Sequence, residues 1–165
     1  MSEEKLLVVD KLRTEFFQSK KSSVTAINEI SFYINKGEIV GLVGESGCGK
    51  SVTSLSIMRL LNFTSGKVTK GEVLFEGTDL QKLSEKEMRQ VRGGKMSMIF
   101  QEPMVSLNPL HSLEKQLYEV LSLHRGMRKE AARGEILDCL ERTGIRNAAK
   151  RLNDFPHQLS GGERQ

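Results

Sequence analysis

A glycine-rich segment at residues 44–51 has residue types whose spacing could bind phosphate. It fits the pattern G-x-x-x-x-G-K-[ST] at every fixed position. Glycine lets the backbone wrap closely enough for successive N–H groups to point at phosphate oxygens. Lys50 would place a positive charge beside the β- and γ-phosphates of a nucleotide, and the Ser51 hydroxyl could ligate Mg²⁺. The predicted nucleotide-binding residues are Gly44, Glu45, Ser46, Gly47, Cys48, Gly49, Lys50 and Ser51.

The flanks of this segment fit such a loop. Residues 38–43 are apolar on both faces, which is typical of an interior strand in a parallel sheet. Residues 51–61 place Val52, Leu55 and Met58 on one face of a predicted helix. The alternative is a glycine-rich turn between strand and helix that binds no ligand. Cys48 occupies a variable position and is interpreted as a small filler rather than as a reactive thiol.

A second candidate lies at residues 159–165, which read Leu-Ser-Gly-Gly-Glu-Arg-Gln. If a helix starts there, the Ser160 hydroxyl and the open N–H groups of Gly161 and Gly162 offer another anion site. For these three residues taken alone, a helix N-cap serine in a surface turn is the better interpretation. Gln101 directly follows a predicted strand at residues 96–100. For this residue taken alone, a surface glutamine at a strand end is as good an interpretation as a functional residue.

The composition limits the class of protein. The chain has 165 residues, 38% apolar and 28% charged, with a formal charge of +4, which predicts about one domain. No apolar run approaches the ~18 residues of a membrane span, and the polar start is unlike a secretory signal. Two cysteines without a CxxC pattern exclude a disulfide framework and indicate a reducing cytosol. Charge spread evenly along the chain predicts no nucleic-acid partner.

The remaining elements form two groups. Residues 5–37 read as antiparallel strands, with apolar Ile30, Phe32 and Ile34 alternating with polar neighbours, and a turn at Gly37. Residues 72–75 form another strand, and Ser84 with Glu87 forms a capping box that opens a helix to about residue 92. After residue 103 the pattern is helical. Its apolar faces are Leu113, Leu117, Val120 and Leu121, then Ala132, Ile136, Cys139 and Leu140, with Gly144 as a C-cap.

The string LSGGERQ, following a phosphate loop, resembles the signature motif of ATP-binding cassette proteins. The resemblance implies that Ser160, Gly161 and Gly162 contact the γ-phosphate held by the opposite subunit. It also places Gln101 at the Q-loop glutamine, which senses Mg²⁺ and the attacking water and relays to a transmembrane partner. Lys50 and Gln101 are therefore the catalytic candidates, and Ser51 and Gln101 the Mg²⁺ candidates. The family stacks an aromatic residue on adenine, for which Phe16 is preferred over Phe17.

The strings GESGCGKSVTSLSIMRLL, MSMIFQEPMVSLNPLH and DFPHQLSGGERQ resemble the ATP-binding subunits of bacterial dipeptide and oligopeptide importers. This resemblance implies ATP and Mg²⁺ as cofactors, a second ATP-binding subunit and a membrane permease as partners, and the cytoplasmic face of the inner membrane as location. It also implies an α/β, P-loop ABC-type ATPase fold with an incomplete core sheet. Within it, residues 1–101 form the β-subdomain and the loop part of the core, 102–158 a helical subdomain, and 159–165 the start of the signature helix.

Two alternatives stay open. In the family the second Mg²⁺ ligand, the glutamate that polarises water and the switch histidine follow the signature, whereas His111, His124 and His157 precede it. The 165 residues by themselves are therefore expected to be a truncated cassette that is inactive alone, which could bind nucleotide without hydrolysis. A non-transport cassette ATPase is the other alternative. The short interval from Gln101 to Ser160, without sustained heptads, argues against the long coiled coil of that class.

Overall fold

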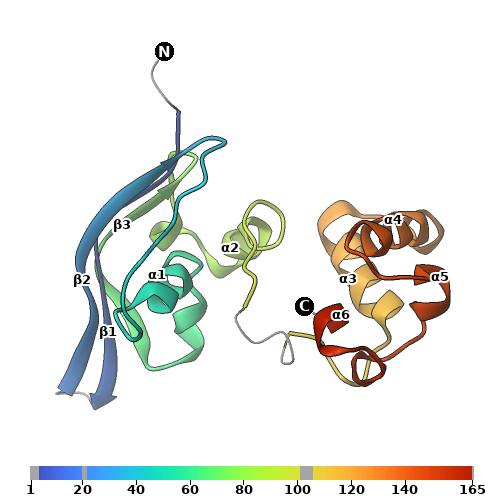
Figure 1. Cartoon of the computed structure of the whole chain (residues 1–165). Coiled ribbons are helices and arrows are strands. Elements are labelled where there is room, and N and C mark those ends of the chain that lie inside the picture. Colours follow the sequence, from blue (N-terminus) through green and yellow to red (C-terminus); the bar gives the residue numbers. More distant parts are fainter. Residues whose placement is uncertain (1–3, 20–21, 101–105, 165) are drawn as a thin grey trace. The chain divides into compact units, whose positions relative to one another are not determined.

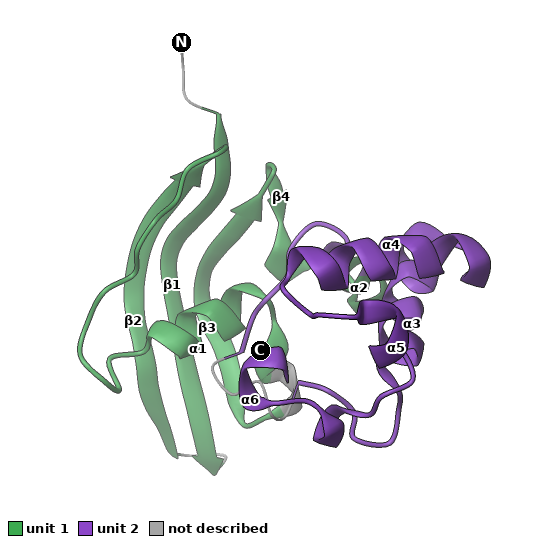
Figure 2. Ribbon diagram, turned by 45° about the vertical axis from the view of Figure 1, so that its right-hand side comes forward, with its two compact units in different colours: residues 1–89 green, residues 90–165 purple. Residues whose placement is uncertain are grey.

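The computed structural model describes residues 4–19, 22–100 and 106–164. The chain divides into two compact units, residues 1–89 and 90–165 (Figure 2). The predicted subdomain boundary at residues 101 and 102 lies outside the described residues. In the described ranges, no helix combines the length and the apolar composition that crossing a bilayer requires.

The first unit is built on an antiparallel sheet. Its strands are β1 (Lys5–Ser19), β2 (Ser22–Asn35), β3 (Gly66–Phe75) and β4 (Thr78–Asp79), in the order β2-β1-β3-β4 (Figure 1). The predicted pairing of antiparallel strands within residues 5–37 is confirmed. Ile30, Phe32 and Ile34 are half-buried as predicted, and Gly37 takes a positive φ of 77° in the turn after β2. The sheet buries side chains that include Leu7, Val9, Leu12 and Val73.

The ladders that β1 forms with β2 and with β3 both change register near Lys11. Between Val9 and Leu12, β1 carries an extra residue relative to β2, and Lys11 there has a φ of 46°. The β1–β3 ladder shifts at the same place, opposite Gly71 of β3. The Lys11 N–H donates to the Ser31 hydroxyl at 2.8 Å, so the bulged backbone keeps a partner. Bulges bend a strand and raise its twist, which gives the sheet its curvature (Figure 1).

Short helices cover one face of this sheet. They are α1 (Lys50–Ile57) and the 3₁₀ turns η1 (Leu60–Phe63) and η2 (Leu80–Lys82), and the helix α2 (Glu85–Val91) follows in the chain. The capping box predicted before α2 is confirmed: the Ser84 N–H donates to Glu87 Oε2 at 2.8 Å, and the Glu87 N–H donates to Ser84 Oγ at 3.3 Å.

The buried face of α1 differs from the predicted one. Met58, just after the helix, is buried, but Val52 and Leu55 are only half-buried. Thr53 and Ser56 take the interior positions instead. Hydroxyl groups can be buried there because each has a hydrogen-bond partner, which removes most of the cost of losing water.

Residues 38–43 and 96–100 are not strands, so these two predictions are wrong for the described chain. Only an isolated bridge between Arg92 and Met96 touches either segment. The segments leave apolar side chains in solvent: Ile39 is 98% exposed, Val43 91% and Ile99 89%. A strand needs a neighbour to pair its N–H and C=O groups, and no described residue supplies a ladder to either segment. Their apolar pattern is therefore that of interior strands without the adjoining strands.

The second unit is helical. It contains α3 (Leu113–Arg125), α4 (Lys129–Arg142), α5 (Ala148–Arg151), the 3₁₀ turn η4 (Pro156–Gln158) and α6 (Gly161–Arg164). Its core consists of Ala132, Ile136 and Leu152, with half-buried residues that include Leu117, Leu121 and Leu140 packed against them.

Two predicted members of the apolar faces lie outside this core. Val120 is 54% exposed and Cys139 is exposed, so both predictions are wrong. The reason is that two short packed helices bury only a narrow stripe of each. The C-cap predicted at Gly144 is one residue too late: Thr143 is the C-cap of α4, and Gly144 follows it with a φ of 87°. The Ile145 N–H donates to the Leu140 carbonyl at 2.9 Å, which closes the helix end.

Candidate functional site

The glycine-rich loop at residues 44–51 leads into the start of α1. Gly47 and Gly49 have φ values of 83° and 101°, a conformation that side chains other than glycine rarely adopt. Gly49 is the N-cap of α1, and no side chain caps this helix start. The first N–H groups of α1 are therefore left for water or an anionic ligand, and the helix dipole favours negative charge at the same point.

Lys50 lies within the loop. Its ammonium group donates to the carbonyl oxygens of Gly44 and Glu45, both at 2.7 Å, and contacts Cys48 Sγ at 3.6 Å. These carbonyls are neutral acceptors, and a phosphate oxygen would give a stronger, charge-assisted hydrogen bond. Ser51 follows on the first turn of α1 with an exposed side chain. The loop thus brings together a cation, a hydroxyl oxygen and an uncapped helix start.

Gly49 is also required by space, because its close neighbour is a backbone atom. A Cβ atom on Gly49 would lie 3.0 Å from the Ala26 carbonyl oxygen, so the loop approaches β2 closely. A Cβ atom on Gly44 would lie 2.6 Å from Cys48 Sγ. The loop is consequently held against the sheet at Gly49, whereas at Gly44 only the Cys48 side chain would have to move.

The two aromatic candidates for adenine stacking have different surroundings. Phe16 is half-buried on β1, with its ring over Gly66 of β3, where a Cβ atom would come within 2.9 Å of Phe16 Cε1. Phe17 is 38% exposed, and the Lys67 ammonium lies 5.9 Å from its ring centroid. Either ring could stack on a base, so the preference for Phe16 stays a prediction.

The second candidate segment forms a capped helix start in the second unit. The Ser160 N–H donates to Glu163 Oε2 at 2.8 Å, and the Glu163 N–H donates to Ser160 Oγ at 3.3 Å. Arg151 holds the same carboxylate at 2.9 Å and also pairs with Asp154 at 3.0 Å. Ser160, Gly161 and Gly162 are exposed on this short helix. Sequence reasoning missed Arg151, since nothing in its local pattern marks it as a partner of Glu163.

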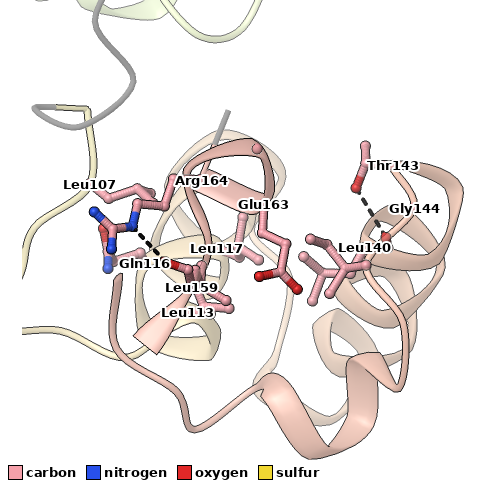
Figure 3. A pocket seen from close by; sticks show the side chains of 12 residues that line it. Leu107, Leu113, Gln116, Leu117, Leu140, Thr143, Gly144, Leu159, Glu163 and Arg164 are labelled. Atoms are coloured by element: carbon pink, nitrogen blue, oxygen red, sulfur yellow. Dashed lines mark hydrogen bonds between the residues drawn. The ribbon is translucent and has the colours of Figure 1, made fainter. Parts of the chain in front are cut away.

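A cavity of about 380 Å³ lies in the second unit, beside α6 (Figure 3). Arg164 is among its lining residues, and Arg164 Nε donates to the Leu159 carbonyl at 3.0 Å. Most of the lining is apolar, so the cavity carries no catalytic arrangement. The lining residues are Leu107, Leu113, Gln116, Leu117, Leu140, Thr143, Gly144, Ile145, Leu159, Gly162, Glu163 and Arg164.

Gln101, the third predicted element of the site, lies outside the described residues. The loop at residues 44–51 and the segment at residues 159–164 belong to different units, and each has the local geometry given above.

Comparison with known proteins decides the family. Residues 27–165 match the family model described as ABC transporter. The chain belongs to the ABC transporter family. The predicted family membership is confirmed.

Two curated relatives are similar to nearly all of this ABC transporter chain. The uncharacterized ABC transporter ATP-binding protein YejF of Escherichia coli (strain K12) is 61% identical over 160 residues, which cover 97% of the chain and 30% of YejF. The dipeptide transport ATP-binding protein DppD of Bacillus subtilis (strain 168) is 51% identical over 162 residues, which cover 98% of the chain and 48% of DppD. The chain therefore spans less than half the length of these relatives.

A solved structure supports the same family at the level of the fold. The dimeric ATP-binding cassette MJ0796, in a post-hydrolysis state bound to ADP and Pi, has a TM-score of 0.80 and is 28% identical to this ABC transporter chain. The match covers 96% of the chain and 65% of the cassette. The predicted fold class, an ABC-type ATPase with an antiparallel sheet and a helical part, is confirmed.

The capped start of α6 gives this ABC transporter chain a pH-dependent feature. Hydrogen bonds from the Ser160 N–H and hydroxyl, together with Arg151, hold the pKa of Glu163 below its ordinary value. The cap therefore contributes stability above the unfolded pKa of glutamate, about 4.3, and loses it as pH falls through the lowered folded value. We expect the Ser160 amide chemical shift to titrate with a midpoint below about 4.3. In Glu163→Gln, which keeps an acceptor oxygen, this titration should vanish; an unchanged midpoint would contradict the assignment.

Proposed function

We propose that the chain binds ATP with Mg²⁺ at residues 44–51 and belongs to an ATP-binding subunit that powers the import of dipeptides or oligopeptides. The observation that carries the nucleotide site is Lys50, whose ammonium lies inside the loop at the uncapped start of α1. The printed name of the relative DppD supports peptide as the transported class. Membership of the ABC transporter family supports coupling of ATP to transport.

Four residues have proposed individual roles at this site: Lys50 and Ser51 in the loop, and Gln101 and Phe16 outside it. Lys50 exchanges its carbonyl partners for the β- and γ-phosphates, and the N–H groups of the loop and of the first turn of α1 donate to phosphate oxygens. The Ser51 hydroxyl is a hard oxygen ligand that suits Mg²⁺, with Gln101 as the second proposed ligand. Mg²⁺, when bound, neutralises charge on the phosphate oxygens. Phe16 is the proposed stacking partner of adenine.

The proposed partners follow from the family. Ser160, Gly161 and Gly162 would contact the nucleotide of a second ATP-binding subunit, and this role is supported by their exposure at the start of α6. The helical region 102–158 would contact a membrane permease at the cytoplasmic face of the inner membrane. Residues 1–101 would then form the nucleotide-binding part, and residues 159–165 the start of the signature helix.

Leu107 tests the coupling to transport. It lies in the proposed permease-contacting region, between Gln101 and the signature, whereas Glu102 lies outside the described residues. We expect Leu107→Ala to lower peptide uptake several-fold in the assembled transporter while ATP hydrolysis by the full-length subunit changes less than about twofold, because a docking contact acts on coupling rather than on the phosphates. Val24→Ala, which truncates an exposed apolar residue on β2, is the matched control and should leave uptake unchanged. Equal losses of uptake and hydrolysis in Leu107→Ala would contradict the coupling role.

A second candidate function is nucleotide binding without hydrolysis by residues 1–165 themselves. It needs only the phosphate-binding features of the loop, which are the Lys50 ammonium and the uncapped start of α1. A phosphate-release assay on residues 1–165, with Lys50→Ala as the blank, distinguishes hydrolysis from binding without hydrolysis. Lys50-dependent release of phosphate would exclude the binding-only function.

A further inference from the structure

Two hydroxyl groups in the first unit are fully buried and bonded to each other. Thr14 lies on β1 and Ser56 on α1, both with 0% exposure, and their oxygens are 2.9 Å apart. They are 42 residues apart in the sequence, so the pair joins the central strand of the sheet to the helix that follows the phosphate loop.

The direction of this hydrogen bond follows from the neighbouring contacts. The Ser56 hydroxyl donates to the Val52 carbonyl oxygen at 2.7 Å. A carbonyl oxygen has no hydrogen to give, so the single hydroxyl hydrogen of Ser56 is used there. Thr14 must therefore be the donor to Ser56. The result is a relay from β1 through Ser56 to the backbone of α1, one turn closer to the loop.

Burial alone does not explain why these positions carry hydroxyl groups. Serine in a helix interior is a poorer helix former than alanine, and replacing both members of a buried polar pair by apolar groups of similar shape is often close to neutral for stability. A hydrogen bond differs from an apolar contact in being directional. This pair fixes how far α1 is rotated and shifted along β1, which an apolar pair would fix less tightly.

The position of α1 determines the position of the phosphate loop. Lys50 and Ser51 are on its first turn, and the Gly49 carbonyl accepts from both the N–H and the hydroxyl of Thr53, at 2.8 and 2.9 Å. Ser56 is about 9 Å along the helix axis from Lys50, at 1.5 Å per residue. A tilt of about 10° at Ser56 would therefore move the loop end by more than 1 Å, a displacement that can change a reaction rate up to about 10²-fold.

Resting on the proposed ATP site, we propose that Thr14 and Ser56 are positioning residues for the phosphate loop. Gly49 holds one end of the segment against β2, and the hydroxyl relay holds the other end against β1. The pair sets the distance of Lys50, Ser51 and the first N–H groups of α1 from the triphosphate. Neither residue contacts the nucleotide.

The test compares nucleotide affinity with stability in the full-length protein. Thr14→Val removes the donor and keeps the shape, Thr14→Ser keeps the donor and removes a methyl group, and Ser56→Ala removes the acceptor. The titration uses a fluorescent ATP analogue with Mg²⁺ at a temperature well below the melting temperature of each variant. We expect Thr14→Val and Ser56→Ala each to raise the Kd about tenfold, because the loop is misplaced. Thr14→Ser should restore near-normal affinity.

Val73→Ala is the stability control. Val73 is fully buried on β3, away from the relay, and its truncation should lower the melting temperature at least as much while leaving Kd unchanged. An unchanged Kd in Thr14→Val, or an equal rise in Val73→Ala, would overturn the positioning role. If the unaltered protein shows no Lys50-dependent binding, the proposed ATP site itself fails. If Lys50-dependent binding persists and is indifferent to Thr14 and Ser56, only the relay fails.

Discussion

Lys50→Ala is expected to raise the Kd for ATP with Mg²⁺ by about 100-fold or more, which takes binding beyond the range of a fluorescent-nucleotide titration. Hydrogen bonds from a charged donor contribute about 1.5–3 kcal/mol each, and Lys50 can make more than one to the β- and γ-phosphates. In the structure its ammonium is already placed inside the loop, within 2.7 Å of two backbone oxygens. Its loss therefore removes the cation from the site, and no nearby loop residue carries a replacement charge.

Lys36→Ala is the matched control for this titration. Lys36 lies in the turn after β2, in the same unit, and its side chain is 67% exposed. Its ammonium forms a surface pair with Glu4 at 3.4 Å. Surface pairs of this kind contribute little, so neither affinity nor stability should change measurably. A Kd that is unchanged in Lys50→Ala would remove the nucleotide site from residues 44–51.

Gly71→Ala is expected to lower the free energy of unfolding by about 2–4 kcal/mol. A Cβ atom at Gly71 would lie 2.4 Å from the Lys11 carbonyl oxygen and 2.5 Å from the Asp10 carbonyl oxygen, both backbone atoms that cannot rotate away. The φ of 92° adds strain for any residue with a Cβ atom. Because the contact holds β3 against the bulge of β1, the strands would have to separate locally. Urea unfolding followed by circular dichroism measures the loss.

Gly77→Ala isolates the part of this loss that comes from crowding. Gly77 also has a positive φ, 76°, but a Cβ atom there would meet nothing within 4 Å. Its substitution should cost only the backbone term, about 1–2 kcal/mol. Losses of equal size at Gly71 and Gly77 would show that the close approach of β3 to β1 does not limit stability.

Local sequence signals predicted the local parts of this fold. The alternation at Ile30, Phe32 and Ile34, the capping box at Ser84 and the positive φ at Gly144 each depend on residues within one turn or strand, and each is present in the structure. The conformation of the loop at residues 44–51 is local in the same way, because the positive φ values at Gly47 and Gly49 and the contacts of the Lys50 ammonium involve only residues of the loop.

The features that sequence reasoning missed depend on distant partners. Ile39 and Val43 have the pattern of a buried strand, yet burial requires neighbouring strands that the described residues do not provide. No local pattern marks Thr14 or Ser56, since their pairing joins a strand to a helix 42 residues later. The spacing of Cys139 predicts a place on the apolar face of α4, yet the residue is exposed. It lies outside the stripe that α3 and α4 bury between them.

The irregularities in the sheet compensate for one another, which limits how the strand lengths can change. The extra residue of β1 between Val9 and Leu12 is followed by an extra residue of β2 between Ile30 and Ile27, so the Val9–Phe32 and Thr14–Ile27 pairs stand in matching register. β3 makes the same correction between Lys70 and Val68. Because side chains alternate between faces, deleting one residue of β1 alone would send Thr14 and Phe16 to the opposite face of the sheet. A homologue could lose the bulge only by shortening all three strands together, so single-residue deletions here should be found as a matched set or not at all.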